Sequence, residues 1–166
     1  TVGANEDHRD FNQYYSDDIY VGYRFNSTFN VPVAYSFGYG LSYTTFDFSN
    51  SALTANTLNT DGAKGSITIK TTVRNTGTRA GKEVAQVYIS APEVKLAKPT
   101  IELKAFAKTN VLEANGTQDL TMTIPAETLA SFDSDSDQWI IEPGRYAVFI
   151  NSSSDVYGVT PVRFQI

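Results

Sequence analysis

The sequence has no cysteine, and it holds only one methionine, one tryptophan and one histidine in 166 residues. Without cysteine there can be no disulfide and no thiol nucleophile, so the apolar core must stabilise the fold without cross-links. Long apolar stretches are absent too, because no run approaches the roughly 20 residues that a membrane-spanning helix needs. These absences exclude a disulfide scaffold, a cysteine-dependent enzyme and a helical membrane protein.

Positive charge is also scarce. Lys and Arg number 13 against 18 Asp and Glu, which gives a formal net charge of -5. The basic residues are scattered and alternate with acids, whereas phosphate binding needs clustered Lys and Arg. We therefore expect no nucleic-acid partner and no membrane partner.

Residues that favour strands are plentiful, with 10 Tyr, 10 Phe and many Thr, and Asn, Ser and Gly mark the turns between them. From Thr44 onward, apolar and polar residues alternate with period two, and no amphipathic helix of useful length interrupts them. The predicted strands number seven and cover residues 44–50, 66–75, 83–90, 101–112, 117–124, 144–151 and 159–166. This pattern predicts an all-β fold, an immunoglobulin-like or fibronectin-like sandwich over residues 44–166.

The alternation also predicts which side chains face the core. The inward positions are Ile67, Ile69, Thr71, Val73, Leu120, Met122, Ile124, Tyr146, Val148 and Ile150, followed in the terminal strand by Val162, Phe164 and Ile166. We expect Trp139 or Ile141 to meet the inward face of strand 144–151. A single tryptophan in a seven-strand pattern is typically a core residue.

Turn chemistry separates these strands. Asn75-Thr-Gly77 predicts a turn with a positive φ at Gly77, and Glu142-Pro-Gly-Arg145 predicts a tight turn. Residues 50–65 predict a long exposed loop, and residues 127–132 leave room for only one helical turn.

Residues 1–43 form a separate arm or linker in this interpretation. Residues 1–12 are polar and aperiodic, which indicates a loop or loose end, while residues 18–25 alternate as a strand does. That strand needs a partner sheet, so its unpaired edge predicts self-association of the chain. Residues 35–46 predict a packed linker, in which Gly38 and Gly40 allow close approaches between aromatic anchors.

Six short motifs carry a family resemblance. In order along the chain they are Asp18-Ile-Tyr-Val-Gly-Tyr-Arg24, Phe37-Gly-Tyr-Gly-Leu-Ser-Tyr-Thr44, Asn75-Thr-Gly77, Ala80-Gly-Lys-Glu-Val-Ala-Gln-Val-Tyr-Ile-Ser90, Glu102-Leu-Lys-Ala-Phe-Ala-Lys108, and Trp139 with Glu142-Pro-Gly144. Together they resemble the C-terminal region of glycoside hydrolase family 3, and the resemblance covers essentially the whole chain. Six motifs in one order are far more specific than any one of them.

The resemblance implies a fibronectin type III-like sandwich preceded, over residues 1–43, by the end of an α/β domain. It also implies a parent enzyme that is a retaining β-glycosidase of β-glucosidase or β-xylosidase type, secreted or periplasmic. In that family the nucleophilic aspartate lies in a barrel and the acid/base glutamate in the α/β domain, and neither motif occurs here. The expected partners are the catalytic domains, in the same chain or with this chain as a separate fragment.

Two groups of acidic residues could be interpreted as a catalytic or a metal site. Asp17 and Asp18 are neighbours, and neighbours on a strand point to opposite faces, so we expect a turn at this position and no catalytic pair. Residues 133–137 carry acids at the first, third and fifth positions of a calcium loop, but Gln138 and Gly144 stand where glycine and glutamate belong. We expect a solvated acidic loop there.

The remaining candidates also favour ordinary roles. His8 beside Asp7 lacks an assignable nucleophile, so we expect a solvated terminal histidine. The cluster of Lys95, Lys98, Lys104 and Lys108 predicts a solvated face. The sequence therefore assigns no catalytic, cofactor or metal site.

Two functions remain open. The favoured one is a non-catalytic module that stabilises the catalytic domains of a β-glycosidase. Its loop around residues 93–100 would form part of the enzyme surface. The alternative is an independent carbohydrate-binding or adhesion module that uses exposed aromatic side chains. Because most aromatics fall at inward positions, we expect no measurable binding of glucans. A third function, that of a self-sufficient hydrolase, is strongly disfavoured by the missing acid/base pair.

Overall fold

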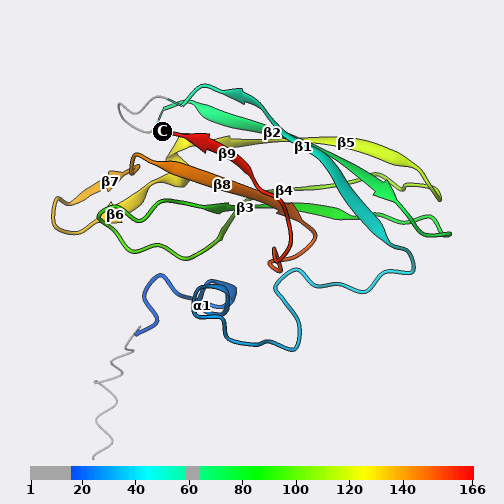
Figure 1. The fold of residues 1–166 in the computed structure, drawn as a ribbon, viewed down its shortest axis with the longest axis horizontal. Helices are drawn as coiled ribbons and strands as arrows, with labels where there is room; N and C mark the ends of the chain where they lie inside the picture. Colours follow the sequence, from blue (N-terminus) through cyan, green and yellow to red (C-terminus); the bar gives the residue numbers. More distant parts are fainter. Residues whose placement is uncertain (1–15, 59–63) are drawn as a thin grey trace, which may run out of the picture.

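The computed structural model of the chain describes residues 16–58 and 64–166. Two antiparallel sheets pack face to face as a sandwich, which confirms the predicted fold class (Figure 1). The first sheet has the order β1-β2-β5, with bounds Phe46–Asn56, Ser66–Asn75 and Thr117–Pro125. The second has the order β4-β3-β8-β9, with bounds Glu102–Lys108, Val84–Ser90, Arg145–Asn151 and Val162–Gln165.

The core lies between these sheets and is built by the predicted alternation. Strand β2 shows it most clearly, because Ile67, Ile69, Thr71 and Val73 are fully buried while Lys70 and Arg74 are exposed. On the opposite sheet, the stacked rings of Tyr146 and Phe164 lie 5.0 Å apart, centroid to centroid. The buried apolar cluster comprises Ile67, Ile69, Val73, Ala85, Val87, Ile89, Leu112, Leu120, Met122, Ile124, Leu129, Tyr146, Val148, Ile150 and Phe164.

One buried polar residue ties the end of β2 to its surroundings. The Asn75 side chain accepts a hydrogen bond from the Thr44 hydroxyl at 2.6 Å and donates to the carbonyls of Arg79 and Leu112 at 2.7 and 2.8 Å. Gly77 follows in the turn, but not with the positive φ that we predicted. A Cβ on Gly77 would lie 2.2 Å from the Thr44 hydroxyl oxygen, so close approach is what requires glycine here.

Two short elements lie beyond the two sheets. The 3-10 helix η1 (Ala126–Leu129) supplies the expected single helical turn, and strands β6 (Ser131–Asp133) and β7 (Gln138–Ile140) form a small hairpin that the sequence did not predict. The predicted loop over residues 50–65 is wrong in its first part, because β1 continues to Asn56 with two irregularities in register. Residues 59–63 of that prediction lie outside the described residues.

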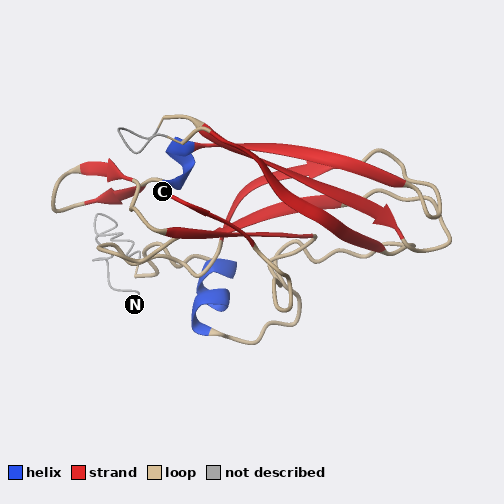
Figure 2. Ribbon diagram, turned by 45° about the horizontal axis from the view of Figure 1, so that its top comes forward, coloured by secondary structure: helices blue, strands red, loops and turns tan. Residues whose placement is uncertain are grey.

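The predicted strand over residues 18–25 is also wrong. A turn covers residues 16–19, and Tyr23–Phe29 form helix α1, which begins after Gly22 at φ 61° and ends at Asn30 at φ 53°. A strand needs a neighbouring strand to satisfy its backbone, whereas a helical turn satisfies it locally. The helix lies outside the sandwich, over the face of the β4-β3-β8-β9 sheet (Figure 2).

Candidate functional site

The arm, defined here as its described residues 16–43, is fixed to the outer face of the second sheet. In this arm the ring of Tyr23 stacks on Phe37 with centroids 4.9 Å apart and meets Tyr88 of β3 edge-on at 5.8 Å. The Tyr23 hydroxyl accepts a hydrogen bond from the backbone N–H of Leu103 at 2.8 Å. Burial beneath the arm raises the pKa of Tyr88, and its hydroxyl donates to Gln86 at 2.6 Å.

Two further contacts hold the arm along its length. The Thr28 hydroxyl accepts a hydrogen bond from the N–H of Thr100 at 2.9 Å, and the carbonyl of Phe37 accepts one from Ser154 at 2.8 Å. Gly38 then crosses directly over Gln86, because a Cβ at Gly38 would lie 2.3 Å from the amide nitrogen of that side chain. The predicted close approach in this linker is confirmed at Gly38, which also has φ 83°.

The outward face of the arm is apolar and uncovered. Leu41 is 94% exposed and Tyr43 is 90% exposed, so the expectation that Tyr43 packs as an anchor is wrong. We call the exposed apolar side chains of this segment the arm surface, and they are Val21, Phe25, Phe29, Val31, Val33, Tyr35, Tyr39, Leu41 and Tyr43. Phe37 is half-exposed but belongs to the inner side, because it stacks on Tyr23. Large exposed apolar patches of this kind mark interaction sites in soluble proteins.

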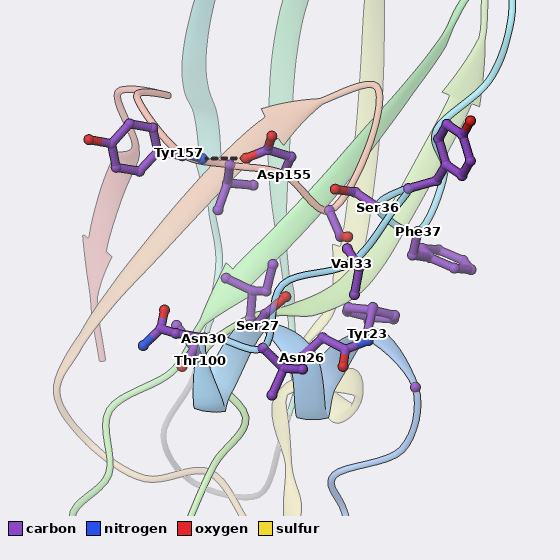
Figure 3. A pocket seen from close by; sticks show the side chains of 16 residues that line it. Tyr23, Asn26, Ser27, Asn30, Val33, Ser36, Phe37, Thr100, Asp155 and Tyr157 are labelled. Carbon is purple, nitrogen blue, oxygen red and sulfur yellow. Dashed lines mark hydrogen bonds between the residues drawn. The ribbon is translucent and has the colours of Figure 1, made fainter.

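A pocket of about 510 Å³ lies where the arm meets the sandwich. Figure 3 shows Asn26 and Ser27 of helix α1, with Asn30 directly after the helix, on one side of the pocket. Asp155 and Tyr157, from the connection after β8, lie on the other side. Among the described residues that line it there is no lysine or arginine, and Asp155 is the single carboxylate. One oxygen of that carboxylate already accepts the N–H of Tyr157 at 3.2 Å.

A buried ion pair organises the loop over residues 91–101, at the edge of the same sheet. The Lys98 ammonium lies 3.1 Å from the Glu142 carboxylate, and both side chains are about 95% buried or more. The prediction that Lys98 belongs to a solvated face is therefore wrong. Burial would raise the pKa of Glu142, but hydrogen bonds from the backbone N–H groups of Lys95 and Leu96, together with Lys98, hold that pKa below its usual range.

A second ion pair fixes the β6–β7 hairpin to this loop. The Lys95 ammonium lies 2.5 Å from the Asp133 carboxylate, whose other donors include the hydroxyl of Ser136 at 2.6 Å. These donors, Lys95 first, lower the pKa of Asp133. Asp133 is buried, so the predicted solvated acidic loop is wrong at its first residue, although Asp135 and Asp137 are exposed. Among the described residues, no group of three or more His, Asp or Glu could hold a metal ion.

Trp139 is not a core residue. It is 69% exposed, whereas the other predicted partner, Ile141, is partly buried and packs against the core cluster. The Asp17-Asp18 pair lies in an exposed turn, where the N–H of Tyr20 donates to the Asp17 carbonyl at 2.8 Å. His8 lies outside the described residues. Within the described residues, no helix is long and apolar enough to cross a membrane.

Comparison with known proteins now identifies the family. The model of a family described as "fibronectin type III-like domain" matches residues 83–154. The chain is 42% identical over 153 residues to the β-glucosidase BoGH3A of Bacteroides ovatus, covering 92% of this chain and 20% of that protein. The chain contains a fibronectin type III-like domain of family 3 β-glucosidases. The resemblance found in the sequence is confirmed.

Solved structures agree with this family 3 assignment. The structure of β-glucosidase 3B from Thermotoga neapolitana in complex with glucose superimposes with a TM-score of 0.80 at 43% identity, covering 91% of this chain and 20% of that chain. The β-glucosidase from Kluyveromyces marxianus in complex with glucose gives 0.79 at 35% identity, covering 92% and 18%. The chain thus spans about a fifth of the length of these relatives.

Several residues of the motifs that carry the family resemblance have structural roles in this chain. Asn75 donates a hydrogen bond from the end of β2 to the carbonyl of Leu112, and Glu142 forms a buried ion pair with Lys98. Gly38 lets the arm pass close to the side chain of Gln86. Gly38, Asn75 and Glu142 do not line the pocket between the arm and the sandwich, although Gly22, Tyr23 and Phe37 of the same motifs do. Sequence reasoning found the motifs but not these partners, because each contact joins residues far apart in the chain.

Proposed function

We propose that this chain is a non-catalytic structural module of a longer β-glucosidase, in which the arm surface packs against the enzyme's other domains. The observation that carries the proposal is the two-sided arm. Its inner side is fixed to the sandwich through Tyr23 and Phe37, while its outer side presents Leu41 and Tyr43 almost fully to solvent. Since the chain spans a fifth of its relatives, the remaining four-fifths are the natural cover for that surface.

The number of exposed apolar side chains in the arm surface supports this role. Burying a large apolar side chain that is now exposed stabilises a contact by roughly 1.5–3 kcal/mol. Several such side chains together outweigh the cost of ordering a short segment. Because the arm is already ordered on the sandwich by hydrogen bonds at Leu103 and Thr100, docking it costs little further conformational entropy.

The arrangement of the carboxylates supports a non-catalytic role for this module. Retaining glycoside hydrolysis uses two carboxyl groups about 5–5.5 Å apart across one sugar ring. The pocket offers only Asp155 among the described lining residues, and the best placed acids elsewhere, Asp133 and Glu142, are engaged with lysines. The parent enzyme's activity on β-glucosides would therefore reside in its other domains.

Two measurements on the chain test the proposal. Purified chain should hydrolyse aryl β-glucosides and β-xylosides at no more than the background rate. Replacing three outward residues together, as Tyr35→Ser, Leu41→Ser and Tyr43→Ser, should reduce both hydrophobic dye binding and self-association by light scattering, with little change in melting temperature. The control Val111→Ser, at an exposed site outside the arm, should change neither.

Different outcomes would contradict different parts of the proposal. Turnover that disappears with Asp155→Asn would overturn the non-catalytic role. If the triple variant lowered the melting temperature of the isolated chain as much as Tyr23→Ala does, the outward residues would belong to the module's own core and would not form a docking surface.

A further inference from the structure

The β6–β7 hairpin carries an exposed aromatic pair that the docking role of the arm does not use. Phe132 and Trp139 are directly opposite each other across the hairpin and are 47% and 69% exposed. Their rings meet edge-on, with centroids 5.6 Å apart at an interplanar angle of 63°. This contact braces the indole while leaving most of its area open to solvent.

The underside of the hairpin is clamped in place. Successive residues of a strand point to opposite faces, so Asp133 faces away from Phe132. There the Asp133 carboxylate is buried against Lys95 and also receives the Ser136 hydroxyl and the Asp135 N–H. The Lys95 backbone in turn donates to the buried Glu142, so the clamp is continuous with the 91–101 loop. A binding group held this way is pre-organised and loses little entropy when a ligand arrives.

Apart from Phe132, Trp139 and Ile140, the residues of the hairpin are polar, and none of them is basic. Residues 131–140 contain hydroxyl, amide and carboxylate side chains but no lysine or arginine, and the neighbouring Lys95 is occupied by Asp133 and by Asp135 at 3.9 Å. Phosphate and sulfate ligands are therefore disfavoured. A flat apolar ring on a hairpin rich in hydroxyl, amide and carboxylate groups suits a ligand with an apolar face and a rim of hydroxyl donors. That description fits a pyranose ring.

We propose that the hairpin is a carbohydrate-stacking site for β-linked glucose oligomers, with Trp139 as the stacking platform. The choice of β-glucan rests on the proposed function, because the relatives are β-glucosidases. In that setting the hairpin would hold the chain of a glucan near the enzyme without taking part in its hydrolysis. This reverses the sequence-based expectation of no glucan binding, which assumed that Trp139 faces inward.

The test exploits the fact that Trp139 is the single tryptophan of the chain, so its fluorescence reports on this site alone. Titration with cello-oligosaccharides and a soluble β-glucan should give a saturable shift of the emission maximum to shorter wavelength. Calorimetry on Trp139→Ala should show binding weakened by about tenfold or more, and Phe132→Ala should weaken it less. The control Tyr157→Ala, at an exposed tyrosine outside the hairpin, should bind as the unmodified chain does.

Two outcomes would overturn the inference. One is an emission spectrum unchanged by glucans at millimolar concentrations in a chain whose circular dichroism is native. The other is a shift produced by oligolysine peptides but not by glucans, which would assign the site to a basic protein segment. Neither outcome bears on the docking role, since the triple variant of the arm surface should leave the Trp139 response unchanged.

Discussion

The buried Lys98–Glu142 pair gives the sharpest stability prediction. Replacing Lys98 with methionine keeps most of the side-chain volume but removes the cation 3.1 Å from a carboxylate that is 4% exposed. Breaking a buried pair by removing one partner typically costs about 3–5 kcal/mol, because the remaining charge stays buried without compensation. For a domain of this size, each 1 kcal/mol lowers the melting temperature by roughly 2–4 °C. We therefore expect a loss of roughly 6–20 °C.

The double variant Lys98→Met/Glu142→Gln is the matched control. It removes both charges, while the introduced amide would keep an oxygen for the N–H groups of Lys95 and Leu96, so it should recover a large part of the loss. Urea denaturation at pH 7 followed by circular dichroism gives the free energies of unfolding of the unmodified chain, both single variants and the double variant. A cost below about 1 kcal/mol for Lys98→Met, or a double variant as unstable as the sum of the single ones, would refute this reasoning.

The pH dependence supplies an independent check. The folded-state pKa of Glu142 is depressed, so its contribution is present above its ordinary pKa of 4.5 and is lost as the pH falls through the folded value. In Lys98→Met, the ammonium group that helps to lower the pKa of Glu142 is gone, and protonation of Glu142 removes the unpaired buried charge. The stability difference between the two proteins should therefore shrink as the pH falls from 7 toward 4. A difference that stays constant would contradict the assigned role of Lys98.

Two further predictions concern other buried polar groups. Asn75→Ala leaves the Arg79 and Leu112 carbonyls without their side-chain donor and should cost at least about 1–3 kcal/mol in urea denaturation; no loss would show that water replaces the amide. Burial raises the pKa of Tyr146 to about 12, so its stabilising contribution is complete below pH 10 and is lost as the pH rises toward 12. When unfolding is followed by absorbance at rising pH, the stability of Tyr146→Phe should fall less than that of the unmodified chain. An equal fall in stability would contradict the assignment.

The parts of the fold that sequence predicted well are strands with one buried and one solvated face. Strand β2 was predicted with its observed bounds, because every second residue from Ile67 to Val73 is buried and Asn75, which begins the turn signal, is its last residue. The β6–β7 hairpin escaped prediction because each of its strands has only three residues, too few for a period to appear. Residues 18–25 alternate as a strand does, yet their partner is the outer face of a sheet, which only tertiary structure reveals.

The candidate sites were harder to predict than the fold. A lysine or an aspartate is predicted to be solvated unless its ion-pair partner is known. Asp133 pairs with Lys95, which is 38 residues away in the sequence. Trp139 was expected inside because tryptophan usually is, but its strand lies in a hairpin outside the two main sheets. The family motifs identified the module correctly, whereas the roles of their residues became visible only through these long-range contacts.

The most direct test of the docking role is a chimaera of the Thermotoga neapolitana β-glucosidase 3B in which this chain replaces the matching segment. We predict an active enzyme whose melting temperature falls when Tyr35, Leu41 and Tyr43 are changed together to serine, although the same changes leave the isolated chain's melting temperature nearly unaltered. The control Val111→Ser should alter neither protein. A chimaera as stable with the three serines as without them would contradict the claim that the arm surface joins this module to the rest of the enzyme.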